Sequence, residues 1–235
     1  MKNEELRIKN EKRRRAGTPW RQAFRFAAVA LFALAFFLLY AIPYTLYAES
    51  SPFDAIKTTY SKINTLTARF HQKILISSLG KEREFDGSFF YKRGKGFLWQ
   101  YGSPKGKFFL YDGKFIWQGE EEKPFVTKDR VNKEKTGGTF LDLVEDFSKL
   151  DDLFSLKGQG KAGDTDILEL VPKKDSTIKS AKVWIDKENI VKKIEIHEFT
   201  GNVNVIDFSS IKVNQPVEDG RFVFKPEKGK EIMER

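Results

Sequence analysis

Apolar residues recur along this chain at two different spacings, and the change from one to the other predicts its elements. Over Phe53–Leu66 they lie three or four positions apart behind Pro52, which is typical of one amphipathic helix. Beyond this stretch, aromatic and aliphatic residues alternate with polar ones, which predicts strands. Gly80 marks a turn, and Asp112-Gly113 between two alternating runs is a strong hairpin signal. Residues 66–130 are therefore expected to form a meander of antiparallel strands.

The alternation stops in the stretch 137–156, where apolar residues return to helical spacing. This spacing predicts one or two short helices carrying Phe140, Leu143, Val144 and Phe147. Alternation then resumes in five further segments, which we expect to be strands: 165–171, 181–186, 190–199, 202–213 and 221–224. The pattern as a whole predicts a mainly β chain with one leading helix and one helical interruption.

The aromatic residues are concentrated in one part of the predicted meander. Of the 22 Phe, 7 Tyr and 4 Trp in the chain, twelve fall between positions 85 and 117, and most share one face. Each of them, taken singly, is an ordinary core residue of a well-packed sheet. Taken together, an aromatic inner face on a curved sheet can enclose an apolar cavity. The pattern alone leaves open whether that interior is filled or hollow.

Residues 1–48 have the order of segments that is typical of a secretory signal. A polar, basic stretch containing Arg13–Arg15 is followed by an apolar run over 26–42 and then by the small residue Ala48. We expect cleavage after Ala48 and one folded domain over 49–235. The alternative is an uncleaved membrane anchor. In both cases the domain lies outside the cytoplasm.

The net charge of the chain has a different meaning once the predicted signal is left out. Residues 1–48 carry nine Lys/Arg and three Asp/Glu, so most of the net charge of +9 belongs to them. The remaining sequence mixes both signs, which argues against the basic stripe of a nucleic-acid-binding protein. The chain has no cysteine, so a domain over 49–235 must be held together by its core. For the same reason the protein is not itself a lipoprotein, since such proteins are acylated on cysteine.

Sequence motifs that carry catalysis are missing. His71 and His197 are the only histidines, and each stands among polar neighbours in a strand pattern, as surface histidines do. The sequence has no Gly-x-Ser-x-Gly elbow, no phosphate-binding loop and no Cys/His spacing for a metal. We therefore expect neither an enzyme nor a bound cofactor or metal.

The chain resembles the periplasmic outer-membrane lipoprotein carrier (LolA) family in the segment FFYKRGKGFLWQYGSPKGKFFLYDGKFIW. The residues that match the family's signature are Lys92, Arg93, Phe97, Trp99, Pro104, Asp112, Gly113, Lys114 and Trp117. Two positions differ, because Gly94 replaces the usual proline and Tyr111 replaces the common serine. Farther along, the similarity continues in LELVPKK, KVWIDKENIVKKIEI and GRFVFKPEKG, so that it spans roughly 53–230.

The resemblance implies an open, highly curved antiparallel β half-barrel covered by a helical lid. It also implies an acyl-chain cavity lined by the aromatic residues Phe70, Phe85, Phe89, Tyr91, Phe97, Trp99, Tyr101, Phe109 and Trp117. Arg93 matches the arginine that in this family bonds to the lid and holds the cavity shut. The lid helix would carry Phe140, Leu143, Val144 and Phe147.

The implied function is that of a monomeric periplasmic chaperone. It would take triacylated lipoproteins from an inner-membrane ABC transporter of the LolCDE type to an outer-membrane receptor lipoprotein of similar fold. Three alternatives stay open: a membrane-anchored lipid-binding sensor or regulator, an exported esterase, and a carrier of another lipid such as a glycolipid or polyketide. No nucleophile–base pair supports the esterase, and retention of the signal would favour the sensor.

Overall fold

Most of the described chain is β-strand. The computed structural model describes residues 51–103, 106–131, 147–226 and 228–234. The strands before the helical interruption are β1 (Thr65–Ile76), β2 (Lys81–Lys92), β3 (Gly96–Tyr101), β4 (Phe108–Tyr111), β5 (Phe115–Gly119) and β6 (Phe125–Arg130). Those after it are β7 (Phe154–Ala162), β8 (Thr165–Pro172), β9 (Ile178–Ile185), β10 (Val191–Glu198), β11 (Val203–Val213) and β12 (Glu231–Glu234).

The helical elements are short. Helix α3 (Pro52–Ser61) precedes the sheet, and the 3-10 turn η2 (Phe147–Lys149) runs into helix α5 (Leu150–Leu153) just before β7. Two more 3-10 turns, η1 (Ser77–Leu79) and η3 (Asp219–Phe222), follow β1 and β11. Within the described ranges, no helix combines the length and the apolar character needed to cross a membrane.

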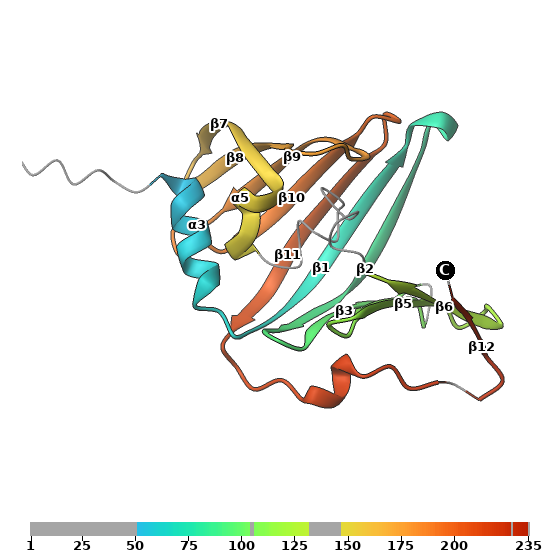
Figure 1. Cartoon of the computed structure of the whole chain (residues 1–235). Coiled ribbons are helices and arrows are strands. Elements are labelled where there is room, and N and C mark those ends of the chain that lie inside the picture. Colours follow the sequence, from blue (N-terminus) through green and yellow to red (C-terminus); the bar gives the residue numbers. More distant parts are fainter. Residues whose placement is uncertain (1–50, 104–105, 132–146, 227, 235) are drawn as a thin grey trace, which may run out of the picture. The chain divides into compact units, whose positions relative to one another are not determined.

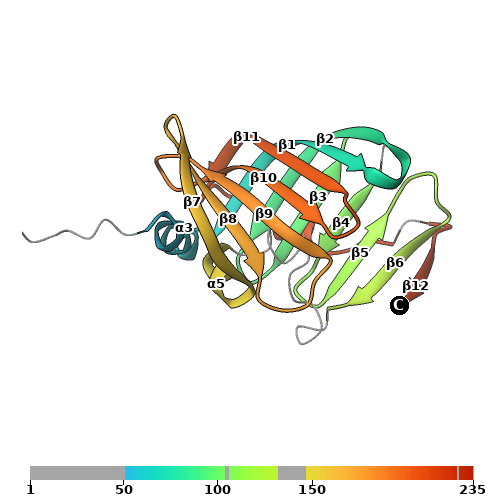
Figure 2. The same cartoon turned by 90° about the horizontal axis from the view of Figure 1, so that it is seen from above.

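The twelve strands form one open sheet in the order β12-β6-β5-β4-β3-β2-β1-β11-β10-β9-β8-β7. All neighbours pair antiparallel except β12 and β6, which pair parallel. The sheet is strongly curved, and α3 and α5 lie at one end of its concave side (Figure 1 and Figure 2). This arrangement confirms the expected open, highly curved and mainly antiparallel sheet with few helices.

Several predictions from the hydrophobic pattern are confirmed. The meander expected over 66–130 is present as β1 to β6, and four of the five later strands are present as β8 to β11. Helix α3 begins as expected, with Pro52 in its first turn and the Ser51 hydroxyl accepting a hydrogen bond from the Asp54 N–H. The predicted signal, Phe140, Leu143 and Val144 lie outside the described residues.

Other predictions are wrong, each for a local reason. Helix α3 ends at Ser61 rather than Leu66, because Leu66 pairs with Tyr91 and Val213 in the sheet. The segment expected as a strand at 221–224 begins instead inside the 3-10 turn η3. Strands β7 and β12 have no counterpart in the predicted pattern, and the start of β7 lies within the stretch predicted to be helical.

Strand register defines which residues share the concave face, because cross-strand partners in an antiparallel sheet point to the same side. One row of successive partners crosses β1 to β6 in the order Ala68, Phe89, Trp99, Phe109, Gln118, Thr127. A second row crosses β8 to β11 in the order Leu168, Val183, Ile194, Ile206, all fully buried. The concave face is therefore aliphatic in one half and mainly aromatic in the other.

Gly87 in β2 lies under the ring of Phe70, and this close approach yields a stability prediction. A Cβ at position 87 would lie 2.3 Å from the Phe70 ring and 2.3 Å from the carbonyl oxygen of Gln100. The ring cannot withdraw easily, because it packs against Trp99 at 4.4 Å between centroids. Gly87→Ala should therefore lower the free energy of unfolding by about 1–3 kcal/mol, measured by urea denaturation.

Gly102 provides the matched control for this substitution. A Cβ at Gly102 would meet only the carbonyl oxygen of Asp86, at 3.5 Å, which is an ordinary contact. Gly102→Ala should change the free energy of unfolding by less than about 0.5 kcal/mol. Equal destabilisation by the two substitutions would show that the crowding under Phe70 is not the cause.

Candidate functional site

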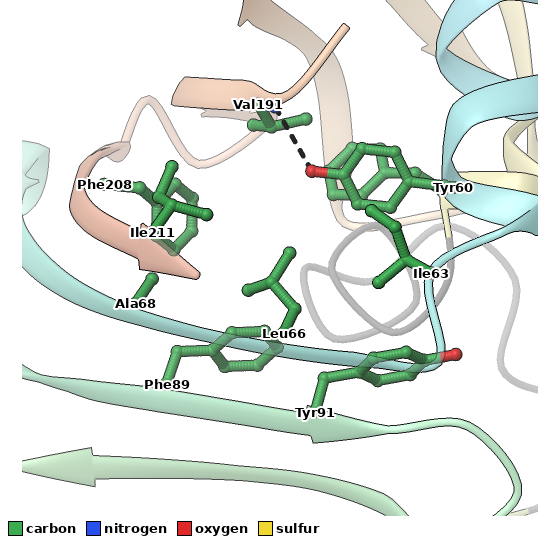
Figure 3. A pocket seen from close by; sticks show the side chains of 10 residues that line it. Tyr60, Ile63, Leu66, Ala68, Phe89, Tyr91, Val191, Phe208 and Ile211 are labelled. Carbon is green, nitrogen blue, oxygen red and sulfur yellow. Dashed lines mark hydrogen bonds between the residues drawn. The ribbon is translucent and has the colours of Figure 1, made fainter. Parts of the chain in front are cut away.

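A small apolar pocket lies between the sheet and the helical elements α3 and η2. Together with α5, which follows η2 directly, these elements form what we call the helical lid. The volume of the pocket is about 30 Å³, room for only one or two water molecules. Figure 3 shows side chains from the lid and from the strands converging on it. The lining residues are Tyr60, Ile63, Leu66, Ala68, Phe89, Tyr91, Phe147, Val191, Phe208 and Ile211. All ten have uncharged side chains.

Tyr60 connects the lid to the far side of the pocket. Its hydroxyl oxygen accepts a hydrogen bond from the Val191 N–H at 3.2 Å (Figure 3), and its ring packs against Phe147 at 4.9 Å between centroids. Burial raises the pKa of Tyr60 well above its usual range, so the hydroxyl stays neutral. The one polar side-chain group that α3 contributes to the pocket wall is thus both uncharged and hydrogen-bonded.

Arg93, in the turn after β2, holds the end of α3 against the sheet. Its Nη2 donates to the carbonyl oxygens of Tyr60 at 2.6 Å and Ile63 at 2.8 Å, and its Nε donates to Ile63 at 3.1 Å. Carbonyl groups at a helix C-terminus lack partners within the helix, and a cation there also complements the helix dipole. The planar guanidinium can serve both carbonyls at once.

Gly94 gives the neighbouring turn a shape that proline cannot adopt. Its φ is +73°, whereas proline fixes φ near about −65°. The turn is closed by a hydrogen bond from the Lys95 N–H to the Lys92 carbonyl at 3.0 Å. The departure from the usual family residue therefore changes the turn but still leaves Arg93 bonded to the end of α3.

An ion pair joins the two helices of the lid. Lys57 of α3 donates to the carboxylate of Asp151 in α5 at 2.6 Å, and both side chains are partly exposed. This hydrogen bond raises the pKa of Lys57 and lowers the pKa of Asp151. Together with the contact between Tyr60 and Phe147, it links α3 to the η2–α5 segment, so the lid has the connections of a single unit.

Most of the residues that the sequence analysis assigned to the cavity fall into three groups: some line the pocket, some are packed in the interior, and some lie farther along the concave face. Phe89, Tyr91 and Phe147 line the pocket, although Phe147 stands in a 3-10 turn rather than in the expected helix. Four other residues do not line the pocket and are packed in the interior, each at most 7% exposed: Phe70, Phe97, Trp99 and Tyr101. Phe85 and Phe109 lie farther along the concave face, with centroids 5.7 Å and 6.1 Å from that of Tyr101.

The assignment of Trp117 to the cavity is wrong, because Trp117 lies on the opposite face of the sheet. Tyr111, which is on the concave face, pairs with Ile116, so the next residue points outward. There the Trp117 ring stacks on Phe224 of the C-terminal segment at 4.2 Å between centroids, and its Nε1–H donates to Asp112 at 2.8 Å. The Asp112–Trp117 hairpin motif therefore supports the convex side of the sheet.

Sequence reasoning did not assign seven of the ten lining residues to the site. Tyr60 and Ile63 were visible only as the apolar stripe of the first helix, and Phe208 as one apolar residue in an alternating run. The full set is Tyr60, Ile63, Leu66, Ala68, Val191, Phe208 and Ile211. These residues come from distant parts of the sequence, and no pattern within a single segment indicates that they meet.

Comparison with known proteins gives consistent results. The family profile described as "Outer membrane lipoprotein carrier protein LolA" matches residues 61–225. The outer-membrane lipoprotein carrier protein of Chromobacterium violaceum is 27% identical over 186 residues, which cover 79% of this chain and 89% of that protein. The protein of the same name from Nitrosomonas europaea is 25% identical over 186 residues, covering 79% and 90%.

A solved structure shares the fold. The crystal structure of an uncharacterized conserved protein from Thermus thermophilus superposes with a TM-score of 0.50 and 11% identity, over 78% of this chain and 97% of that chain. At this level of identity, the likeness concerns the fold alone.

Proposed function

This chain belongs to the outer membrane lipoprotein carrier (LolA) family, and on that basis we propose that it binds the acyl chains of lipoproteins under its helical lid and delivers them to the outer membrane. The proposal places the protein in the periplasm with triacylated lipoproteins as cargo. The donor would be an inner-membrane ABC transporter of the LolCDE type, and the acceptor an outer-membrane receptor lipoprotein of similar fold. The protein would bind and release its cargo without a chemical step.

The observation that carries this proposal is the uncharged, apolar wall of the pocket beneath the lid. Each methylene group moved from water into an apolar site contributes about 0.8 kcal/mol, so a chain of about 15 carbons gains roughly 12 kcal/mol. Such binding depends on apolar area and needs few directional contacts. It therefore suits cargo proteins that share only their acyl chains.

The size of the pocket implies that the lid must move. A volume of about 30 Å³ admits no acyl chain, so loading requires the lid to leave the concave face. The hydrogen bonds from Arg93 to α3, and the one between Tyr60 and Val191, oppose that movement. We propose that Arg93 acts as a latch, which favours the closed state and so assists release of the cargo.

A loading experiment tests the proposed function. The protein would be incubated with energised inner-membrane vesicles that contain a labelled triacylated lipoprotein, and the soluble fraction analysed for a one-to-one complex. The expected result is a soluble complex with the acylated lipoprotein and none with the same protein lacking its acylated cysteine. Equal recovery of both forms, or of neither, would contradict carriage of acyl chains.

A further inference from the structure

A second pocket, of about 140 Å³, lies at β4, β5 and β6, away from the helical lid. Unlike the first pocket, it has a mixed lining in which apolar rings stand beside polar side chains. The residues that matter for its chemistry are Lys107, Phe109, Gln118, Glu120, Lys123 and Thr127. Nothing in the proposed carriage of neutral acyl chains uses these polar groups.

Lys107 contributes a positive charge that forms no ion pair in the described part of the chain, although the Glu120 carboxylate in the same pocket acts on it at longer range. Its ammonium group lies over the rings of Phe85 and Tyr101, at 4.7 Å and 4.6 Å from their centroids. It makes no ion pair or hydrogen bond with any residue in the described part of the chain. Burial lowers its pKa, which indicates that the ammonium has lost part of its water shell. The other lysine of the pocket, Lys123, is paired with Glu120 at 3.4 Å.

Thr127 contributes a buried hydroxyl to the same pocket. The residue is 6% exposed, and its Oγ1 has no hydrogen-bond partner within the described ranges. A buried hydroxyl without a partner costs free energy, so such a group calls for an explanation, and a bound ligand is one. An ammonium and a hydroxyl both donate hydrogen bonds, so a ligand that satisfies both must carry acceptor oxygens.

The register of the sheet connects this pocket to the first one. Ala68 and Phe89 line the first pocket, and successive cross-strand partners lead from them through Trp99 and Phe109 to Gln118 and Thr127. The face therefore changes from apolar to polar along one continuous row. An elongated molecule with an apolar chain and a polar end matches that order.

We propose that the pocket around Lys107 and Thr127 binds the anionic carboxylate or phosphate end of an acyl lipid whose chain lies along the aromatic residues of the concave face. The inference rests on the proposed function, because it uses the same face for the acyl chain. It goes beyond that function, because a triacylated anchor offers this pocket only neutral ester and amide oxygens. A partly buried lysine that is not engaged in an ion pair favours a charged end group over those, because a hydrogen bond between two charged groups is stronger than one to a neutral oxygen.

Binding of four probes tests the proposal, with affinities measured by displacement of an apolar fluorescent dye or by calorimetry. Dodecanoate, dodecyl phosphate and dodecanol share one chain, and inorganic phosphate has none. We expect the two anionic amphiphiles to bind the wild-type protein roughly tenfold more tightly than dodecanol. Lys107→Met should abolish this preference and leave dodecanol binding unchanged, and Thr127→Val should reduce the preference about threefold. Lys123→Met, in the same pocket, should preserve it.

The outcomes separate this proposal from the proposed function. Equal affinity of all three dodecyl probes for the wild-type protein would overturn the anionic site and leave acyl-chain binding intact. An equal loss of affinity for all three probes in Lys107→Met would also overturn the anionic site. Inorganic phosphate that binds as tightly as dodecyl phosphate would show an ion site without a lipid. If dodecanol itself does not bind, acyl-chain binding and the present inference both fail.

Discussion

Replacing Arg93 by leucine is expected to leave loading intact and to slow transfer to the outer-membrane receptor by roughly tenfold or more. The substitution removes three hydrogen bonds, one to the carbonyl group of Tyr60 in the last turn of α3 and two to that of Ile63 just after the helix. The closed state then loses stability relative to the open one, so the apparent affinity for acyl chains rises and release becomes less favourable. A two-step assay, in which loading and onward transfer are measured separately with folded protein, detects the difference.

Arg93→Lys is the informative control. It keeps the positive charge near the helix C-terminus but loses the planar fork that serves both carbonyls, so it should give an intermediate effect. Equal loss of both steps in Arg93→Leu would indicate a purely structural role. Normal loading and normal transfer would rule out a latch.

Glutamate at Ile211 should reduce acyl-chain uptake at least about tenfold while the protein stays folded. Ile211 lines the first pocket from β11 and is only partly buried, so the new carboxylate can reach water while the pocket is closed. An acyl chain would have to displace that water, at a cost of several kcal/mol. Phe97 is a poorer choice for this test, since it is 1% exposed and a glutamate there would compromise the core.

The matched control for Ile211→Glu adds the same charge on an apolar residue outside the pocket. Val223, in the C-terminal segment, is 59% exposed. Val223→Glu should leave both uptake and stability unchanged. Uptake would be followed as the amount of soluble lipoprotein complex formed, with circular dichroism to verify folding. Normal uptake by folded Ile211→Glu protein would show that the first pocket does not hold the chains.

The sequence was sufficient to predict the fold because strand periodicity is a local property. Alternation of Phe85, Phe89 and Phe97 with polar residues indicates strands whatever lies around them, and Asp112-Gly113 indicates the hairpin. Which face a residue occupies depends on register, however, and a shift of one position exchanges the faces. Trp117 was misplaced for this reason, since the pairing of Tyr111 with Ile116 could not be read from the alternation alone.

The pocket was harder to predict than the fold, because whether the interior is hollow depends on the distances between side chains that lie far apart in the sequence. Phe89 and Trp99 are equivalent in the sequence pattern, yet Phe89 borders the pocket and Trp99 fills the core behind it. The resemblance to carrier proteins drew attention to Arg93 as a latch on the lid helix that carries Phe140 to Phe147, whereas its described hydrogen bonds go to the carbonyl groups of Tyr60 and Ile63. Lys107 and Thr127 had no signature in the sequence, because the lack of a partner for a charge or hydroxyl becomes visible only when its neighbours are placed.

The position of β1 in the sheet has a consequence for how the protein acquires its binding site. Strand β1 pairs on one side with β2, its neighbour in sequence, and on the other with β11, whose partner residues stand more than 120 positions later. Pairing between strands so far apart in the sequence costs a large loop-closure entropy, and for this reason it forms slowly. When the chain emerges with its N-terminus first, the aromatic half of the concave face can form early. The wall containing Phe208 and Ile211 forms only when the last strands arrive, so an incomplete chain has no pocket in which to trap lipid.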